Sequence, residues 1–275
     1  MNKNKINILS LQITPQKADK QANIEKIKNL IEKDGKNNYD LIVLPEFFDT
    51  GIDLTNKEVY DYAEEEEKNS PILKELSKLA IKYNTYIHCG SICFKENKKC
   101  YNRAYLLNRK GTIIAQYDKI HLFNYFGGNE GTYTTAGDKL CVVETDFGKI
   151  GLATCFDLRF PEMFTKLTKM GAEIFVLPAA WLTLNNSPKE EKELIINNWK
   201  LISKARAYDN VSYVITANEV GKTHPILEAI GNSMIIDFNG SVLSNAQNNE
   251  CAISAQLDIQ KLRAARKNFP IHTLN

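Results

Sequence analysis

Two apolar segments of the sequence and one alternating segment end at residues that can take part in hydrolysis. Residues 41–44 precede Glu46, residues 149–154 precede Cys155, and Lys119 follows an alternating segment. A carboxylate can accept the proton of a thiol and later activate water, and an ammonium group can stabilise a thiolate and an oxyanion. The thiolate itself can attack a carbonyl carbon. These three residue types together are suited to hydrolysis at a carbonyl group.

The stretch around Cys155 has the order strand, thiol, polar turn and helix. Pro161 can occupy the first helical position, where its missing N–H has no consequence. Apolar residues follow at helical spacing, and Gly171 ends the predicted helix: Met163, Phe164, Leu167 and Met170. This arrangement can hold a nucleophile near backbone N–H groups. The alternative is a buried and inert thiol, which is the commoner state of a free cysteine.

Each of the other candidates also has an ordinary structural interpretation. Glu46 could cap a helix, and Lys119 could be a solvated surface lysine. The cysteines and histidine between residues 88 and 100 could suggest a metal site, but we expect Cys89 and Cys93 to share one strand. At roughly 3.3 Å per residue they would lie about 13 Å apart, too far to bind one zinc ion. The sequence therefore predicts no metal site.

The composition is that of an ordinary globular protein and excludes several classes. Of the 275 residues, 43% are hydrophobic and 25% charged, and 35 basic residues face 33 acidic ones. No basic surplus points to a nucleic acid or an anionic membrane, and no apolar run is long enough to span a bilayer. The N-terminus lacks the apolar core of a signal peptide, so we expect a cytoplasmic protein whose six cysteines are thiols.

Strand and helix patterns alternate along the chain, with hairpins between some of them. The expected strands are 6–13, 41–44, 86–94, 140–143, 149–154, 173–178, 212–217, 233–238 and 252–257, with a hairpin over 104–120; the expected helices include 16–33, 73–83 and 161–170, and one carrying Ile195, Trp199 and Ile202. The acidic run 64–67 is expected to be a solvated loop or helix start. No linker or repeat interrupts the pattern, so we expect residues 1–275 to form a single α/β domain with mixed sheets.

Three blocks make the sequence recognisable. Residues 44–47 (LPEF), 117–122 (YDKIHL) and 154–162 (TCFDLRFPE) resemble the signature blocks of the nitrilase superfamily of carbon–nitrogen hydrolases. The likeness extends through residues 199–207 and 231–237 and so covers nearly the whole chain. It implies a four-layer α-β-β-α sandwich that assembles into homodimers or larger homo-oligomers, and it implies neither a cofactor nor a metal.

The resemblance also implies roles for individual residues. Glu46 corresponds to the general base, Lys119 to the oxyanion stabiliser and Cys155 to the nucleophile, with the backbone N–H of Phe156 as a second oxyanion donor. The family keeps a further glutamate in the loop after the lysine, and Glu130 matches it best.

Within the superfamily, the pattern is most similar to the branch of omega-amidase and deaminated glutathione amidase. Arg159 resembles the position that binds a substrate carboxylate there; a structural ion pair with Glu162 or Asp157 is the alternative, although an arginine fork suits a carboxylate. Trp181 is expected to line the pocket rather than the core. The expected substrate is a small linear amide of the 2-oxoglutaramate or 2-oxosuccinamate type, hydrolysed through a thioester with release of ammonia. An N-carbamoyl amidase, a deaminated glutathione amidase and a non-catalytic scaffold remain alternatives.

Overall fold

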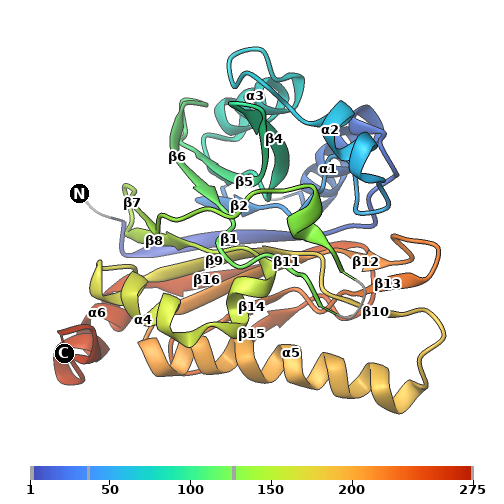
Figure 1. Ribbon diagram of the computed structural model, residues 1–275. Coiled ribbons are helices and arrows are strands. Elements are labelled where there is room, and N and C mark those ends of the chain that lie inside the picture. Colours follow the sequence, from blue (N-terminus) through green and yellow to red (C-terminus); the bar gives the residue numbers. More distant parts are fainter. Residues whose placement is uncertain (1–2, 36–37, 126–127, 274–275) are drawn as a thin grey trace.

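Two large β-sheets pack face to face between two layers of helices. The computed structural model describes residues 3–35, 38–125 and 128–273, and Figure 1 shows the order helices, sheet, sheet, helices from top to bottom. The expected α-β-β-α sandwich is therefore confirmed. No helix among these residues is long and apolar enough to cross a membrane.

The first sheet has the strand order β16-β1-β2-β3-β5-β4, and β6 also pairs with β5. Its strands are β1 (Lys5–Gln12), β2 (Leu41–Val43), β3 (Tyr86–His88), β4 (Ile92–Glu96), β5 (Lys99–Leu107), β6 (Ile113–Asp118) and β16 (Cys251–Asp258). Strands β1, β2 and β3 are parallel, and the other pairings are antiparallel, so the sheet is mixed. All three residues of β2 are buried, because this central strand is covered on both faces.

The second sheet has the order β15-β14-β11-β9-β8-β7, and three short strands form a third sheet in the order β10-β13-β12. The strands of the second sheet are β7 (Cys141–Glu144), β8 (Lys149–Leu152), β9 (Ile174–Ala179), β11 (Tyr213–Asn218), β14 (Met234–Ile236) and β15 (Val242–Asn245). The third sheet consists of β10 (Leu182–Leu184), β12 (Val220–Gly221) and β13 (Leu227–Ile230). The parallel trio β8, β9 and β11 at the centre has its carboxyl ends at one edge, where ligand sites of such sheets collect.

Helices cover the outer face of each large sheet. They are α1 (Lys20–Asp34), α2 (Asn56–Tyr62), α3 (Pro71–Tyr83), α4 (Pro161–Lys169), α5 (Lys189–Asn210) and α6 (Ile259–Asn268), with short 3-10 turns η1 (Glu130–Thr132), η2 (Cys155–Arg159) and η3 (Ile271–Thr273). The apolar faces of α1 and α3 pack with the first sheet in one hydrophobic cluster. Helices α4 and α5 lie below the second sheet (Figure 1).

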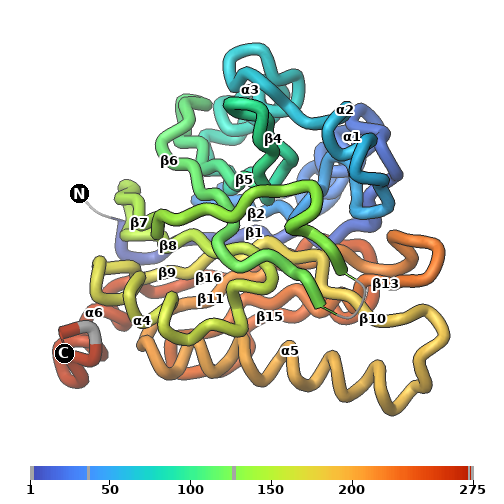
Figure 2. Tube along the Cα trace, viewed as in Figure 1, coloured from blue at the N-terminus to red at the C-terminus, as the bar shows by residue number. Residues whose placement is uncertain are grey.

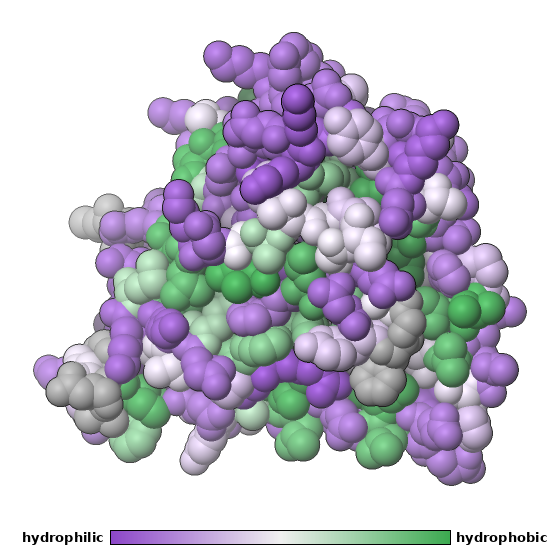
Figure 3. All heavy atoms as spheres, in the orientation of Figure 1, coloured by the Kyte–Doolittle hydropathy of each residue, from purple (hydrophilic) through white to green (hydrophobic). Residues whose placement is uncertain are grey.

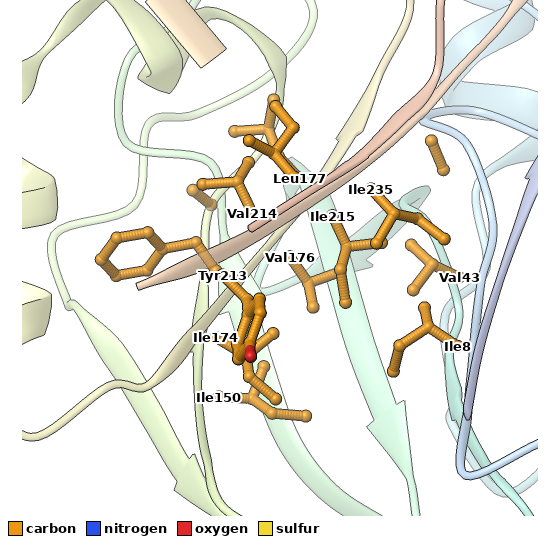
Figure 4. Packing of buried hydrophobic residues seen from close by; sticks show 14 of the residues in the cluster. Ile8, Val43, Ile150, Ile174, Val176, Leu177, Tyr213, Val214, Ile215 and Ile235 are labelled. Carbon is orange, nitrogen blue, oxygen red and sulfur yellow. The ribbon is translucent and has the colours of Figure 1, made fainter. Parts of the chain in front are cut away.

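The main hydrophobic core lies between the two sheets. Figure 4 shows Val176 and Ile215, from the second sheet, near Ile8 and Val43 of the first, and all four are fully buried. Such burial of branched side chains contributes about 1.5–3 kcal/mol each, relative to exposure. Figure 2 shows the segment between β6 and β7, in light green, extending along the boundary between the sheets. This segment carries two of the candidate site residues.

Several local predictions were wrong. The expected strand 86–94 is two strands, because the chain turns at Gly90, whose φ of 51° is left-handed. Consequently Cys89 and Cys93 do not share a strand. Met170 was expected on the buried face of α4 but is 47% exposed, because the helix ends at Lys169. Helix α2 and the third sheet were not predicted.

Candidate active site

Glu46 is buried three residues after the end of β2, at the edge where the parallel strands end. Its side chain is 2% exposed. Oε2 accepts a hydrogen bond from the backbone N–H of Ala180 at 2.8 Å, which ties the segment after β2 to the segment after β9. Gly90 permits this layout, because a Cβ atom there would lie 1.8 Å from the carbonyl oxygen of Pro45.

Lys119 follows β6 and lies between two glutamates. Its Nζ atom is 2.9 Å from Glu46 Oε1 and 2.8 Å from Glu130 Oε2, and its side chain is 2% exposed. Burial disfavours the charged amine, but the carboxylates of Glu130 and Glu46 outweigh it and raise the pKa of Lys119 well above its usual value. Lys119 is therefore a fixed cation at neutral pH.

Glu130 lies in the short turn η1 and completes this group. Its Oε2 atom also accepts the backbone N–H of Phe123 at 2.8 Å. The structure thus brings Glu130, the loop glutamate that the resemblance singled out, next to Lys119.

Asn102, on β5, is a member of the site that the sequence analysis missed. Its Nδ2 atom donates to Glu46 Oε1 at 2.7 Å and to Glu130 Oε1 at 2.9 Å. The signal that could have revealed it is an amide within an otherwise largely apolar strand, since a buried amide needs partners. Asn102 and Lys119 together bridge the two carboxylates.

Cys155 begins the turn η2 in a backbone conformation that is strained for a non-glycine residue. Its φ is 48°, and its side chain is 7% exposed. The turn is fixed by the fully buried Asp157, which accepts the N–H of Thr154 at 2.8 Å and the hydroxyl of Tyr117 at 2.7 Å. The backbone N–H of His121 donates to the same carboxylate at 3.0 Å. Strain maintained by several buried hydrogen bonds indicates a functional turn.

The electrostatics of the site keep the Cys155 thiol protonated. Burial raises the pKa of this thiol well above its usual value, the Glu46 charge adds to the effect, and the Lys119 charge opposes it. Two carboxylates and one ammonium already give the site a net charge of −1, so a free thiolate would add a second uncompensated charge. Transfer of the proton to Glu46 leaves the net charge unchanged. The arrangement therefore favours deprotonation of Cys155 by Glu46 only as the thiol reacts.

Arg159, Phe156 and Trp181 lie together at the outer side of the turn. The Arg159 guanidinium is exposed, and its Cζ atom is 5.5 Å from the centroid of the Trp181 ring and 6.0 Å from that of Phe156. Among the described residues Arg159 forms no ion pair, so the alternative of a pair with Glu162 or Asp157 is not observed. Its charged fork is available to a ligand.

Phe156 contributes its backbone as well as its ring. As the residue after Cys155 in η2, it presents one of the N–H groups that have no partner at the beginning of a helical turn. Its ring packs edge-on against Phe123 and Phe160, with centroids 5.3 and 5.6 Å away. Aromatic side chains thus wall the outer side of the site.

The rejected metal site can be compared with the structure. Within residues 3–35, 38–125 and 128–273, no group of three or more potential ligands could hold a metal ion. His88 is fully buried, and burial lowers its pKa to about 3. All six cysteines are free thiols.

Comparisons with known proteins identify relatives of this chain. The family model for carbon-nitrogen hydrolases matches residues 8–267. The chain is 33% identical to 2-oxoglutaramate amidase of Bacillus subtilis (90% of this chain, 89% of the relative) and 31% identical to deaminated glutathione amidase of Dictyostelium discoideum (98% and 93%). Among solved structures, Saccharomyces cerevisiae Nit3, a member of branch 10 of the nitrilase superfamily, superposes with a TM-score of 0.84 at 27% identity, covering 98% of this chain and 96% of Nit3. The chain belongs to the carbon–nitrogen hydrolase family of the nitrilase superfamily.

Proposed function

We propose that the protein is a cysteine-dependent amidase that hydrolyses a small linear amide carrying a carboxylate, with release of ammonia. The observation that carries this proposal is a buried thiol beside Glu46 and Lys119. Arg159, which forms no ion pair among the described residues, lies at the outer side of the same turn. Relatives named 2-oxoglutaramate amidase and omega-amidase support the substrate class.

The first half of the reaction forms a thioester. Glu46 accepts the Cys155 proton as Sγ attacks the amide carbonyl carbon. The developing oxyanion receives hydrogen bonds from Lys119 Nζ and the N–H of Phe156, and loss of one such donor typically costs 10²–10³ in kcat. Glu46 then returns the proton to the nitrogen, the C–N bond breaks, and ammonia leaves.

The second half hydrolyses the thioester. Glu46 accepts a proton from water as the water oxygen attacks the acyl carbon, and the same two donors stabilise the second oxyanion. The C–S bond breaks, the carboxylic acid is released, and Cys155 regains a proton from Glu46. Glu130 takes no proton in this scheme; with Asn102 it fixes the position of Lys119 and Glu46. No cofactor is required.

The charge and the fork-like geometry of Arg159 support the proposal that the substrate carries a carboxylate. A guanidinium binds a carboxylate through two parallel hydrogen bonds, and this geometry fits the 2-oxoglutaramate and 2-oxosuccinamate type. Deaminated glutathione and N-carbamoyl amino acids also carry carboxylates, so they are the alternative substrates on the same catalytic groups. A non-catalytic scaffold would have no need of the complete Glu46–Lys119–Cys155 set.

Ammonia release from a panel of linear amides tests this function. The panel contains 2-oxoglutaramate, 2-oxosuccinamate, deaminated glutathione and N-carbamoyl amino acids, assayed with the wild type and with Cys155→Ala and Arg159→Lys variants. We expect oxo-acid amides to be hydrolysed, Cys155→Ala to lose at least about 10⁴-fold in kcat, and Arg159→Lys to raise KM about tenfold with little change in kcat. A tenth of the activity remaining in Cys155→Ala contradicts the mechanism. Release only from the carbamoyl compounds contradicts the substrate.

We further propose that the chain is one domain that forms a homo-oligomer. One hydrophobic cluster includes residues of both large sheets, which supports a single domain over residues 1–275. On α5, Leu194, Leu201 and Tyr208 are spaced by seven residues, so they share one helix face, and each is more than half exposed. Figure 3 shows hydrophobic (green) atoms along the lower edge of the molecule, over α5. Such a face supports pairing with a second copy, which sedimentation measurements would test. A cytoplasmic location remains a prediction from the composition.

A further inference from the structure

Glu219 is a buried carboxyl group for which the proposed mechanism has no role. It lies between β11 and β12, is 0% exposed, and neither Oε1 nor Oε2 has a hydrogen-bond partner among the described residues. No lysine, arginine or histidine among the described residues forms an ion pair with Glu219. A buried polar group without a donor is costly and calls for a functional explanation.

The backbone places Glu219 at the same edge of the two sheets as Glu46. Side chains alternate along a strand, so Tyr213, Ile215 and Glu219 share the face of β11 that points toward the first sheet. The hydroxyl of Tyr213 contacts Asp258 of the first sheet, and Figure 4 shows Ile215 facing Val43 of β2. Glu219 continues this face beyond the end of β11, as Glu46 does beyond the end of β2.

One short backbone segment connects the two glutamates. The N–H of Glu219 donates to the carbonyl oxygen of Ala179 at 3.0 Å, and the N–H of the next residue, Ala180, donates to Glu46 Oε2 at 2.8 Å. The N–H of Gly231 donates to the carbonyl oxygen of Glu219 at 3.1 Å, which fixes the backbone from the other side.

The two carboxyl groups differ in their donors, and this difference decides which one carries the charge. Glu46 accepts from Lys119, Asn102 and the Ala180 N–H, all of which stabilise a carboxylate. Among the residues that the structure describes, Glu219 has no comparable donor. Burial, reinforced by the charge of Glu46, raises the pKa of Glu219 well above its usual value. The nearby Thr223 hydroxyl opposes this rise only in part, because among the described residues it forms no hydrogen bond with either oxygen of Glu219. Neighbouring carboxyls in a dry site cannot both ionise readily.

We infer that Glu219 is a positioning residue that holds a proton beside Glu46 and thereby leaves Glu46 as the carboxylate that accepts the Cys155 proton. The neutral Glu219 keeps a second negative charge away from the forming thiolate. When Glu219 loses its proton at alkaline pH, its charge opposes ionisation of Cys155. This inference rests on the proposed roles of Glu46 and Cys155.

Alkylation of Cys155 by iodoacetamide as a function of pH tests the inference in Glu219→Gln, which has the same shape but cannot ionise. Near neutral pH we expect the labelling rate to match the wild type within about twofold, since both side chains are neutral. At alkaline pH the variant lacks the added charge, so its labelling should reach the plateau about 1 pH unit earlier. Labelling needs no amide substrate, so the result holds even if no amide in the panel is hydrolysed.

Infrared difference spectra supply a readout that does not depend on the thiol. The C=O stretching band of a protonated carboxylic acid should be present in the wild type near neutral pH and lost in Glu219→Gln. Asp237→Asn is the matched control. Asp237 also has a buried oxygen without a partner in the described part of the chain, but it lies near the opposite end of β11, so its replacement should leave the labelling profile unchanged. Superimposable labelling profiles for the wild type and Glu219→Gln, or an acid band that is as strong in the variant as in the wild type, overturn the inference.

Discussion

Two clusters in this molecule each place one lysine between two buried carboxylates. Only one of these clusters lies beside the Cys155 thiol. In the first, which we call the Lys119 cluster, Lys119 lies 2.8–2.9 Å from Glu130 and Glu46 and is 2% exposed. Asn102 and two backbone N–H groups also donate to these carboxylates.

The second, the Lys20 cluster, contains Asp49, Lys20 and Glu64. Lys20 is 23% exposed; it contacts Glu64 closely but lies 3.7 Å from Asp49. Asp49 Oδ1 has no partner among the described residues, and burial raises the pKa of this carboxyl to about 6, although the Lys20 charge opposes the rise. The comparison teaches that residue types alone do not make a site. In the Lys119 cluster every carboxylate oxygen accepts a hydrogen bond and a nucleophile lies next to the carboxylates, and these two features distinguish it from the Lys20 cluster.

Replacement of each lysine should give the largest difference between the two clusters in activity and stability. Lys119→Met removes an oxyanion donor and leaves two buried carboxylates without their cation, so we expect at least about 10³-fold loss of kcat and about 3–5 kcal/mol of destabilisation. Lys20→Met removes a partly exposed partner and should cost about 1 kcal/mol with amidase activity retained. Steady-state kinetics and urea unfolding measure both effects. Equal loss of activity in the two variants would contradict the distinction.

Asn102 tests whether bridging hydrogen bonds, rather than charge alone, set up the Lys119 cluster. Asn102→Leu keeps the approximate size but removes both donated bonds. Glu46 Oε1 then keeps only Lys119 as a donor, and Glu130 Oε1 is left without a donor among the described residues. We expect about 1–3 kcal/mol of destabilisation and a decrease in kcat larger than any change in KM. Asn102→Asp would add a third carboxylate and should be worse than Asn102→Leu. A leucine variant with wild-type kcat would show that Lys119 alone orders the carboxylates.

The sequence predicts the Lys119 cluster better than the Lys20 cluster for a physical reason. Glu46 and Cys155 lie within three residues of the ends of buried strands, and Lys119 directly follows a hairpin strand. Local patterns therefore place all three residues at strand ends. Glu64 was instead expected in a solvated acidic run, yet it is 8% exposed because Lys20, more than 40 residues earlier, pairs with it. Local periodicity carries no information about such a distant partner.

The same limit explains what else was missed. Asn102 lies in a strand that the pattern assigned only in part, and its partners are brought together by tertiary structure alone. Glu219 follows an apolar strand and reads as the first residue of a polar loop, where a glutamate is usually solvated. The split of residues 86–94 depends on the close approach of Pro45 to Gly90, which no local signal shows.

The smallest expected effect concerns the pH dependence of stability in the Lys20 cluster. The folded-state pKa of Asp49, about 6, lies above the ordinary value of 3.8, so between these values the folded protein binds more protons than the unfolded chain. Stability therefore falls as pH rises from about 4 to 6, and the ionised carboxyl costs up to about 3 kcal/mol at pH 7. Asp49→Asn removes this cost and should stabilise the protein at pH 7, with the gain vanishing near pH 4.

Urea unfolding at the two pH values measures this difference, and the amidase assay shows whether it stays separate from function. Because Asp49 lies three residues after Glu46 but in a different cluster, we expect kcat of Asp49→Asn to stay within about twofold of the wild type. A gain in stability that is the same at both pH values would mean that Asp49 is not ionised in the folded protein at pH 7. A large loss of kcat would instead mean that the two clusters are coupled, and the charge of the Lys20 cluster would then belong to the electrostatics of the active site.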